Sequence, residues 1–179
     1  RAGDAYWCGP TTIQMMAWNY GDHKKVAQST WASRLGTTTS GTGITNMVAL
    51  VNKNPQLGEW TIHTDQTYIT LSIANHTYAQ WYSLNVNHYS TWTAPVILHP
   101  VLLKSYFPYL DDNGSGHFQL GRGWDAESHK TDSWQIKYYE PWNQRRFDPS
   151  EPSIARKQKR WAKNSYLANR AHFQQNIGV

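Results

Sequence analysis

The chain has 179 residues, 39% of them hydrophobic and only 16% charged, with 10 Trp and 11 Tyr among them. So much aromatic surface can form a core, which excludes a disordered chain, and the length predicts one domain over 1–179. No apolar run approaches the roughly 20 residues that a membrane-spanning helix needs, so we expect no membrane span.

The net charge is +5, and much of the basic excess lies between Arg145 and Arg170. This basic segment is suited to contact with an anionic polymer, although a solvated helix face has the same composition. It is not accompanied by a groove-reading motif or by interleaved aromatic residues. We therefore expect no nucleic-acid partner.

The first third of the chain predicts three helices. The first begins near Pro10, whose missing N–H suits a first helical turn. A short helix is predicted from Ser29 or Thr30 to residue 35, with Gly36 ending it. After the polar loop 37–43, a third helix is predicted to run from 44 until Asn54-Pro55 stops it. The apolar residues at helical spacing in the first helix are Ile13, Met16, Ala17 and Tyr20.

The middle of the chain changes to strand patterns. Residues 67–73 have the β-branched and aromatic content of a strand, 75–89 favours a helix, and 94–103 is a short apolar run. Residues 116–125 and 134–139 alternate between apolar and polar, as half-buried antiparallel strands do. These runs predict an antiparallel sheet.

The segment after Pro149 is predicted to form one or two helices that pack on this sheet. Helices followed by an antiparallel sheet are the pattern of an α+β protein. The residues expected to make the contact are Trp161, Tyr166, Leu167 and Phe173.

Cys8, in the sequence YWCGP, is the only cysteine and stands just before the first helix. A disulfide within the chain and a dithiol motif are thereby excluded. A thiol becomes a nucleophile when a histidine and the open amides of a helix start stabilise its anion. Cys8 is therefore a candidate nucleophile, in a cleft for apolar or extended substrates that Tyr6, Trp7 and Trp142 could line.

Among the eight histidines, His117 fits a partner for Cys8 best. It follows Gly116 and a polar loop and opens the alternating run 116–125, which would place its ring at the rim of a sheet. An imidazole in this role needs an acceptor that holds its tautomer. Glu140 and Asn143, just after the strand 134–139, are the two candidates, and the pattern leaves both open.

Three motifs follow one another in the chain: YWCGPTTIQMM around Cys8, GHFQLGRGWD around His117, and a strand ending in Glu140-Pro141. In this order they resemble the papain-like cysteine peptidases related to the bacteriocin-leader (double-glycine) processing peptidases, in particular the secreted actinobacterial type. The family pattern ends the last strand in Asp-Pro, so the carboxylate here is one methylene longer. The likeness continues in TTTSGTGITNMV and ANRAHFQQNIGV and covers most of the chain.

The resemblance implies an α+β, papain-like fold, with the nucleophile at a helix N-terminus packed on a C-terminal antiparallel sheet. It also implies Cys8 as nucleophile, His117 as general base and acid, and Glu140 as the acid that orients the imidazole. A peptide or protein substrate, no cofactor and a secreted, extracellular location follow from the same likeness. Arg1 in place of an initiating Met agrees with a processed product.

One position departs from the family. Papain-like enzymes generally carry a glutamine about six residues before the nucleophile, where its amide helps to bind the oxyanion. That position is Ala2 here, and Gln14 lies on the wrong side of Cys8. The glutamine is then upstream of Arg1, or another donor replaces it, or activity has been lost.

The leading hypothesis is a thiol-dependent hydrolase that cleaves peptide or amide bonds through a thioester. A transpeptidase or acyltransferase would use the same residues with another acceptor. A catalytically weak or inactive scaffold, acting as a secreted binding module through the basic segment, is the alternative from another class. A metal hydrolase is a more distant one, because His63 and Asp65 form an HxD pair without the third ligand that hydrolytic zinc usually needs, so no metal is expected.

Overall fold

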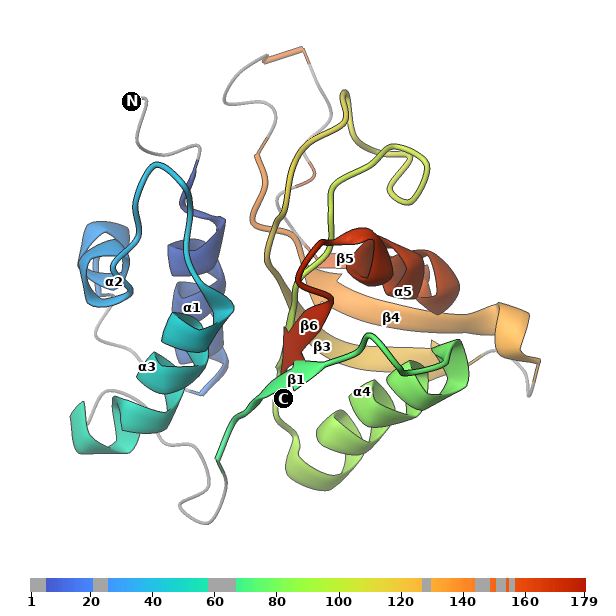
Figure 1. The fold of residues 1–179 in the computed structure, drawn as a ribbon, viewed down its shortest axis with the longest axis horizontal. Coiled ribbons are helices and arrows are strands. Elements are labelled where there is room, and N and C mark those ends of the chain that lie inside the picture. The colour runs from blue at the N-terminus through green and yellow to red at the C-terminus, as the bar shows by residue number, and fades with distance from the viewer. Residues whose placement is uncertain are drawn as a thin grey trace.

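The computed structural model describes residues 6–20, 26–57, 67–126, 130–143, 149–150, 154 and 157–179. Within these residues it combines five α-helices with a six-stranded antiparallel sheet, so the α+β prediction is confirmed (Figure 1). The helices are α1 (Cys8–Asn19), α2 (Gln28–Arg34), α3 (Ile44–Leu57), α4 (Tyr78–Trp92) and α5 (Ala162–Ala171). The strands are β1 (Thr70–Ser72), β2 (Val96–Leu98), β3 (Gln119–Ala126), β4 (Trp134–Tyr139), β5 (Lys157–Trp161) and β6 (Asn176–Gly178).

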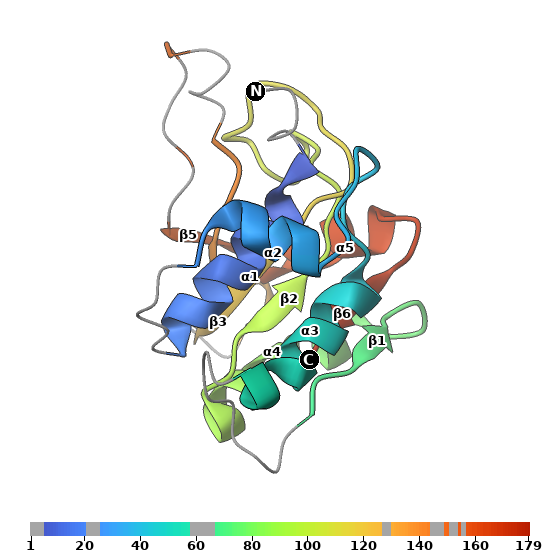
Figure 2. The same cartoon turned by 90° about the vertical axis from the view of Figure 1, so that its left-hand side faces the viewer.

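The sheet has the strand order β1-β6-β2-β3-β4-β5, and every described pair is antiparallel. Helices lie on both sides of it, with α1, α2 and α3 on one side and α4 and α5 on the other (Figures 1 and 2). Both faces of the central strand β2 are therefore covered. Ile97 packs into the core with α1 and α3, while its neighbours Val96 and Leu98 pack into the core on the other face. This explains why 94–103 is a continuous apolar run rather than an alternating one.

The first three helices lie close to their predicted positions. The prediction that Gly36 ends the second helix is confirmed, because Gly36 follows α2 with a φ of 61°, in the left-handed region that favours glycine. The prediction that Asn54-Pro55 ends the third helix is wrong by two residues, since α3 runs to Leu57. A proline loses one amide donor but keeps a helical φ, so the last turn can continue past it.

The middle segments also have the predicted type. The helix expected over 75–89 is α4, which starts three residues later at a capping box. There the Thr77 hydroxyl accepts from the Gln80 amide (3.3 Å) while the Gln80 side chain accepts from the Thr77 amide (2.8 Å).

The C-terminal segment differs most from its prediction. It contains two strands, β5 and β6, with only α5 as a helix between them. Residues 157–161 alternate between exposed and half-buried because β5 pairs with β4, and β6 inserts between β1 and β2, which lie far away in the sequence. The helix prediction used only residues that are close in the sequence, so it could not detect this long-range pairing.

Of the four residues predicted to pack on the sheet, Tyr166 alone packs against a core cluster, and its ring contacts are with α4. The Tyr166 ring lies 5.9 Å from the Trp81 ring between centroids, and its hydroxyl donates to the His76 carbonyl (2.7 Å). The other three side chains are exposed to different extents, namely Leu167 (38%), Trp161 (48%) and Phe173 (86%).

Candidate active site

Cys8 is the first residue of α1 and is half-buried. The start of this helix is held by the polar loop 37–43, which packs against Gly9. A Cβ on Gly9 would lie 2.5 Å from the Thr42 hydroxyl oxygen and 2.6 Å from the Thr42 Cβ, so only glycine fits. The Thr42 hydroxyl is itself within 2.8 Å of the Thr37 hydroxyl. The position of the Cys8 thiol therefore depends on both the loop and the CGP motif.

The Cys8 thiol is surrounded by hydrogen-bond donors. The His117 side chain and the amides of Phe118 and Gly9 all lie within hydrogen-bonding reach of the sulfur. Burial by itself would raise the pKa of the thiol. The hydrogen bond and positive charge of His117, together with the two amides, outweigh burial and lower the pKa of Cys8 below its ordinary value.

His117 lies two residues before β3 and is only 4% exposed. Its amide donates to the Pro100 carbonyl (2.9 Å), which ties the residue to the end of β2. Its ring Nε2 lies 2.6 Å from the Glu140 Oε1, which leaves Nδ1 for the thiol. Burial opposes the imidazolium, but the Glu140 carboxylate and the hydrogen bonds with Cys8 and Glu140 raise the pKa of His117 to about 10.

Glu140 is 1% exposed and directly follows β4. Its Oε1 accepts from the His117 ring and from the Trp142 amide (2.8 Å). Its Oε2 accepts from the Tyr109 hydroxyl (3.0 Å) and from the Gln119 amide nitrogen (2.7 Å). Four donors thus surround the two oxygens, which is the number that a carboxylate can accept and which holds it in one orientation.

The pairing of β3 with β4 brings these side chains together. Leu120 pairs with Tyr139, so the beginning of β3 and the end of β4 lie at the same end of the sheet. His117 precedes this pair and Glu140 follows it. From sequence alone, it was open whether the two ends coincide.

Asn143, the alternative acceptor, is exposed, and the ring nitrogen that it would bind is held by Glu140. Gln14 has a structural contact instead of an oxyanion role, because its amide donates to the Val26 carbonyl (3.1 Å). Ala2, His63 and Asp65 lie outside the described residues. Of the aromatic residues expected to line a cleft, Tyr6 is 42% exposed, while Trp142 packs partly buried against the core.

The basic residues of this segment that the structure describes make contacts in different places. The Arg160 guanidinium lies over the Tyr109 ring (4.6 Å), and the Arg170 guanidinium donates to the Ile73 and Ala74 carbonyls. The Lys159 ammonium lies 3.5 Å from an Asp125 carboxylate oxygen on the surface. Arg145 and Arg146 lie outside the described residues. The predicted contact with an anionic polymer stays a prediction.

The side chains that hold Glu140 were not predicted from the sequence. Gln119 could have been found, because alternation along a strand places it on the same side as His117. Tyr109 lies in the irregular segment between β2 and β3 and has no such signal. It also approaches the Tyr138 hydroxyl (3.1 Å), so a chain of polar contacts extends from the thiol into the core.

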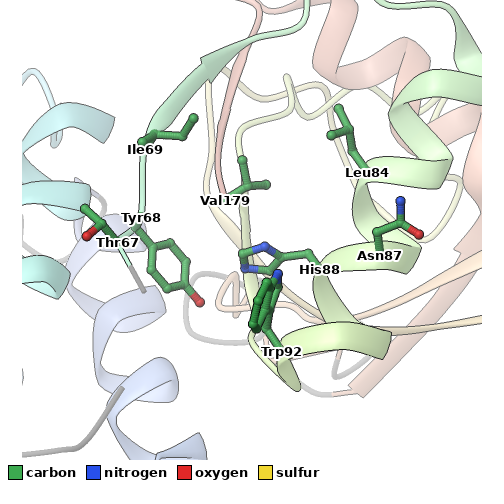
Figure 3. Close-up of a pocket in the computed structure, with 8 residues that line it drawn as sticks. All are labelled: Thr67, Tyr68, Ile69, Leu84, Asn87, His88, Trp92 and Val179. Carbon is green, nitrogen blue, oxygen red and sulfur yellow. The ribbon is translucent and has the colours of Figure 1, made fainter. Parts of the chain in front are cut away.

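A cavity of about 430 Å³ lies near the start of β2, and Figure 3 shows the side chains that line it. Tyr68 connects its wall to that end, since its hydroxyl donates to the carbonyl of Pro95 (2.6 Å), directly before β2. Cys8, His117 and Glu140 are not among its lining residues, so the cavity does not hold a substrate at the thiol. The lining residues are Thr67, Tyr68, Ile69, Leu84, Asn87, His88, Trp92 and Val179.

Comparison with protein-family models, curated proteins and solved structures found no match. Within the described residues, no helix combines the length and apolar character needed to cross a membrane.

Proposed function

We propose that this chain is a papain-like thiol hydrolase that cleaves peptide or amide bonds. The observation that carries the proposal is a buried imidazole between a thiol and a carboxylate, with His117 Nε2 2.6 Å from Glu140 Oε1 and its other side on Cys8. The opposite pKa shifts of Cys8 and His117 favour a thiolate facing an imidazolium. This is the charge state in which a thiol attacks a carbonyl.

In the reaction, the Cys8 thiolate attacks the carbonyl carbon and forms a tetrahedral oxyanion. The Cys8 amide, at the open start of α1, is the backbone donor for this oxyanion. The His117 imidazolium then donates its proton to the leaving amine, and a thioester remains. His117, now neutral, takes a proton from water as the water attacks the thioester, and the carboxylic acid leaves with the thiolate restored.

Glu140 supports both proton transfers. It holds the His117 ring by its Nε2 hydrogen, so that Nδ1 faces the sulfur in the neutral and in the charged state. The Glu140 carboxylate also stabilises the imidazolium. A peptide substrate and secretion follow from the resemblance to the leader-processing peptidases, and a transpeptidase would differ only in using an amine in place of water.

The direct test is the pH dependence of alkylation by iodoacetamide. Because Cys8 is the only cysteine in the chain, the labelling rate reports on this residue alone. We expect the folded protein to react at pH 6 faster than the same protein in urea, where the thiol has an ordinary pKa of about 8.5. Slower labelling of the folded protein at every pH would instead favour a binding module without catalysis.

Turnover is tested on a fluorescein-labelled casein as a general protein substrate. Cys8→Ser should fold normally and release no fluorescent peptides, because a hydroxyl is not ionised by the same surroundings. Retained cleavage by Cys8→Ser would remove the nucleophile assignment.

A further inference from the structure

Two further histidines lie beside the proposed site and take no part in the proton transfers proposed above. His99 follows β2 and His172 follows α5, and each is only 5% exposed. Their ring centroids are 3.7 Å apart. Burying a polar ring costs stability unless its nitrogens have hydrogen-bond partners. Two buried imidazoles next to His117 therefore suggest a role for these residues at the site.

The His99 ring is fixed on two sides. It stacks on the Phe118 ring, with centroids 4.2 Å apart and an interplanar angle of 14°. Its Nδ1 lies 2.7 Å from Asn176 Oδ1, and because that oxygen only accepts, Nδ1 carries the proton. The Asn169 side chain donates to the carbonyls of His99 (2.7 Å) and Asn176 (3.1 Å), which joins the end of β2 to β6.

The His172 ring packs against the His99 ring and also restricts position 116, the residue before the proposed base His117. A Cβ at Gly116 would lie 2.5 Å from His172 Nε2, so a side chain at position 116 would displace the ring. The Gly-His pair and the C-terminal ANRAHFQQNIGV segment are thus two halves of one packing arrangement.

The His99 ring is connected to the Cys8 sulfur through Phe118. Phe118, on which His99 stacks, is the residue whose amide lies within hydrogen-bonding reach of the Cys8 thiol. Pro100, next to His99, accepts the His117 amide (2.9 Å). Residues 117 and 118 are therefore both held by the 99–100 segment, one through its backbone and the other through a ring.

We propose that His99 is a positioning residue, whose ring, stacked on Phe118, keeps the Phe118 amide directed at the Cys8 sulfur and so sets the acidity of the thiol. The proposal rests on the proposed thiolate function of Cys8. Burial above all, and the nearby His172 and His117, lower the pKa of His99 to about 3, so the ring is neutral where His117 is charged. A neutral ring stacks without repelling the imidazolium.

The test compares two matched substitutions by the alkylation profile of Cys8. His99→Leu removes the flat ring, and we expect the midpoint of the profile to rise by about one pH unit, which means about tenfold slower labelling below the midpoint. His88→Leu is the control, because His88 also has a pKa lowered by burial, to about 4, but lies in the cavity wall at the other end of β2. Its midpoint should not move.

His99→Phe adds a rescue arm, since it keeps a flat ring against Phe118 and loses only the bond to Asn176. Its midpoint should return toward that of the wild type. Equal midpoints for His99→Leu and the wild type, or an equal rise in His88→Leu, would overturn the positioning role. An ordinary midpoint near 8.5 in the wild type would overturn the thiolate function as well, so the two failures are distinct. If His99→Leu does not fold, Phe118→Leu removes the other half of the stack and is judged by the same midpoint.

Discussion

At the scale of single residues, the proposed site is a short chain of groups in which each one directs the next. Glu140 fixes the His117 ring, and the ring faces Cys8. Tyr109 and Gln119 in turn fix Glu140 from behind. The reactivity of the thiol therefore depends on side chains that do not touch it.

Glu140→Gln should slow turnover on the order of a hundredfold, because an amide brings its own hydrogens toward groups that donate and no longer supports the imidazolium. Asn143→Ala should leave the casein assay nearly unchanged, since Asn143 is exposed. Glu140→Asp, the residue of the family pattern, should retain more activity than Glu140→Gln. A larger loss of activity in Asn143→Ala than in Glu140→Gln would mean that Asn143, and not Glu140, orients the His117 ring.

His117→Ala should raise the midpoint of Cys8 alkylation above that of the wild type. The substitution removes the hydrogen bond and positive charge that oppose burial of the thiol, and leaves only the two amides. Labelling at pH 6 should fall below that of the urea-denatured protein. An unchanged profile would mean that another group acidifies the thiol.

At the scale of elements, the start of α1 and the loop 37–43 form one unit. The loop approaches Gly9 so closely that Thr42 occupies the space that a side chain at position 9 would need. The TTTSGTG sequence thus has a structural reason to accompany CGP. The same kind of close contact joins Gly116 to His172 at the other side of the site.

Gly9→Ala should therefore destabilise the protein by about 1–3 kcal/mol, as overpacking commonly does. The new Cβ would meet Thr42, and the displaced loop should also shift the alkylation midpoint of Cys8. Thr42→Gly in the same chain removes the atoms that clash and should restore part of both losses. Chemical denaturation measures the first effect, and a double variant no better than Gly9→Ala would contradict the clash.

At the scale of the whole molecule, buried and half-buried histidines couple stability to pH. His88, His99 and His172 have pKa values lowered mainly by burial, the first two to about 4 and about 3. As the pH falls, these residues take up protons near pH 6.5 in the unfolded chain but only at lower pH in the folded protein. They therefore lower the free energy of unfolding increasingly as the pH falls below 6.5. His117 acts in the opposite sense, since its raised pKa stabilises the fold fully below pH 6.5 and loses this effect as the pH rises through about 10.

The melting temperature should consequently fall between pH 6.5 and pH 4. His117 contributes a constant stabilisation in this window, whereas the three neutral histidines each favour the unfolded chain more as protons become available. Calorimetry at several pH values measures the trend, and His88→Leu should show a shallower fall than the wild type. A melting temperature that does not change over this window would contradict the burial of neutral rings.

The sequence by itself determined the local elements and the chemistry that they can carry. Helical spacing and Gly36 located the first helices, and alternation located β3 and β4, because these signals arise between residues that are close in the chain. Cys8 and His117 were candidates from residue type and position. Glu140 and Asn143 both remained open on those grounds, and only the resemblance favoured Glu140. The structure brings Cys8, His117 and Glu140 together.

The tertiary structure decided the strands β5 and β6 and the side chains that surround the proposed site. At the His117 ring it has Glu140, the residue that the resemblance implied, and not Asn143. β6 pairs with both β1 and β2, which are distant in the sequence. Glu140 reaches the imidazole because the register of β3 and β4 aligns their ends. Tyr109, His99 and His172 contact the site only after distant segments have packed. Contacts of this kind depend on the whole fold, so no pattern along the chain can encode them locally.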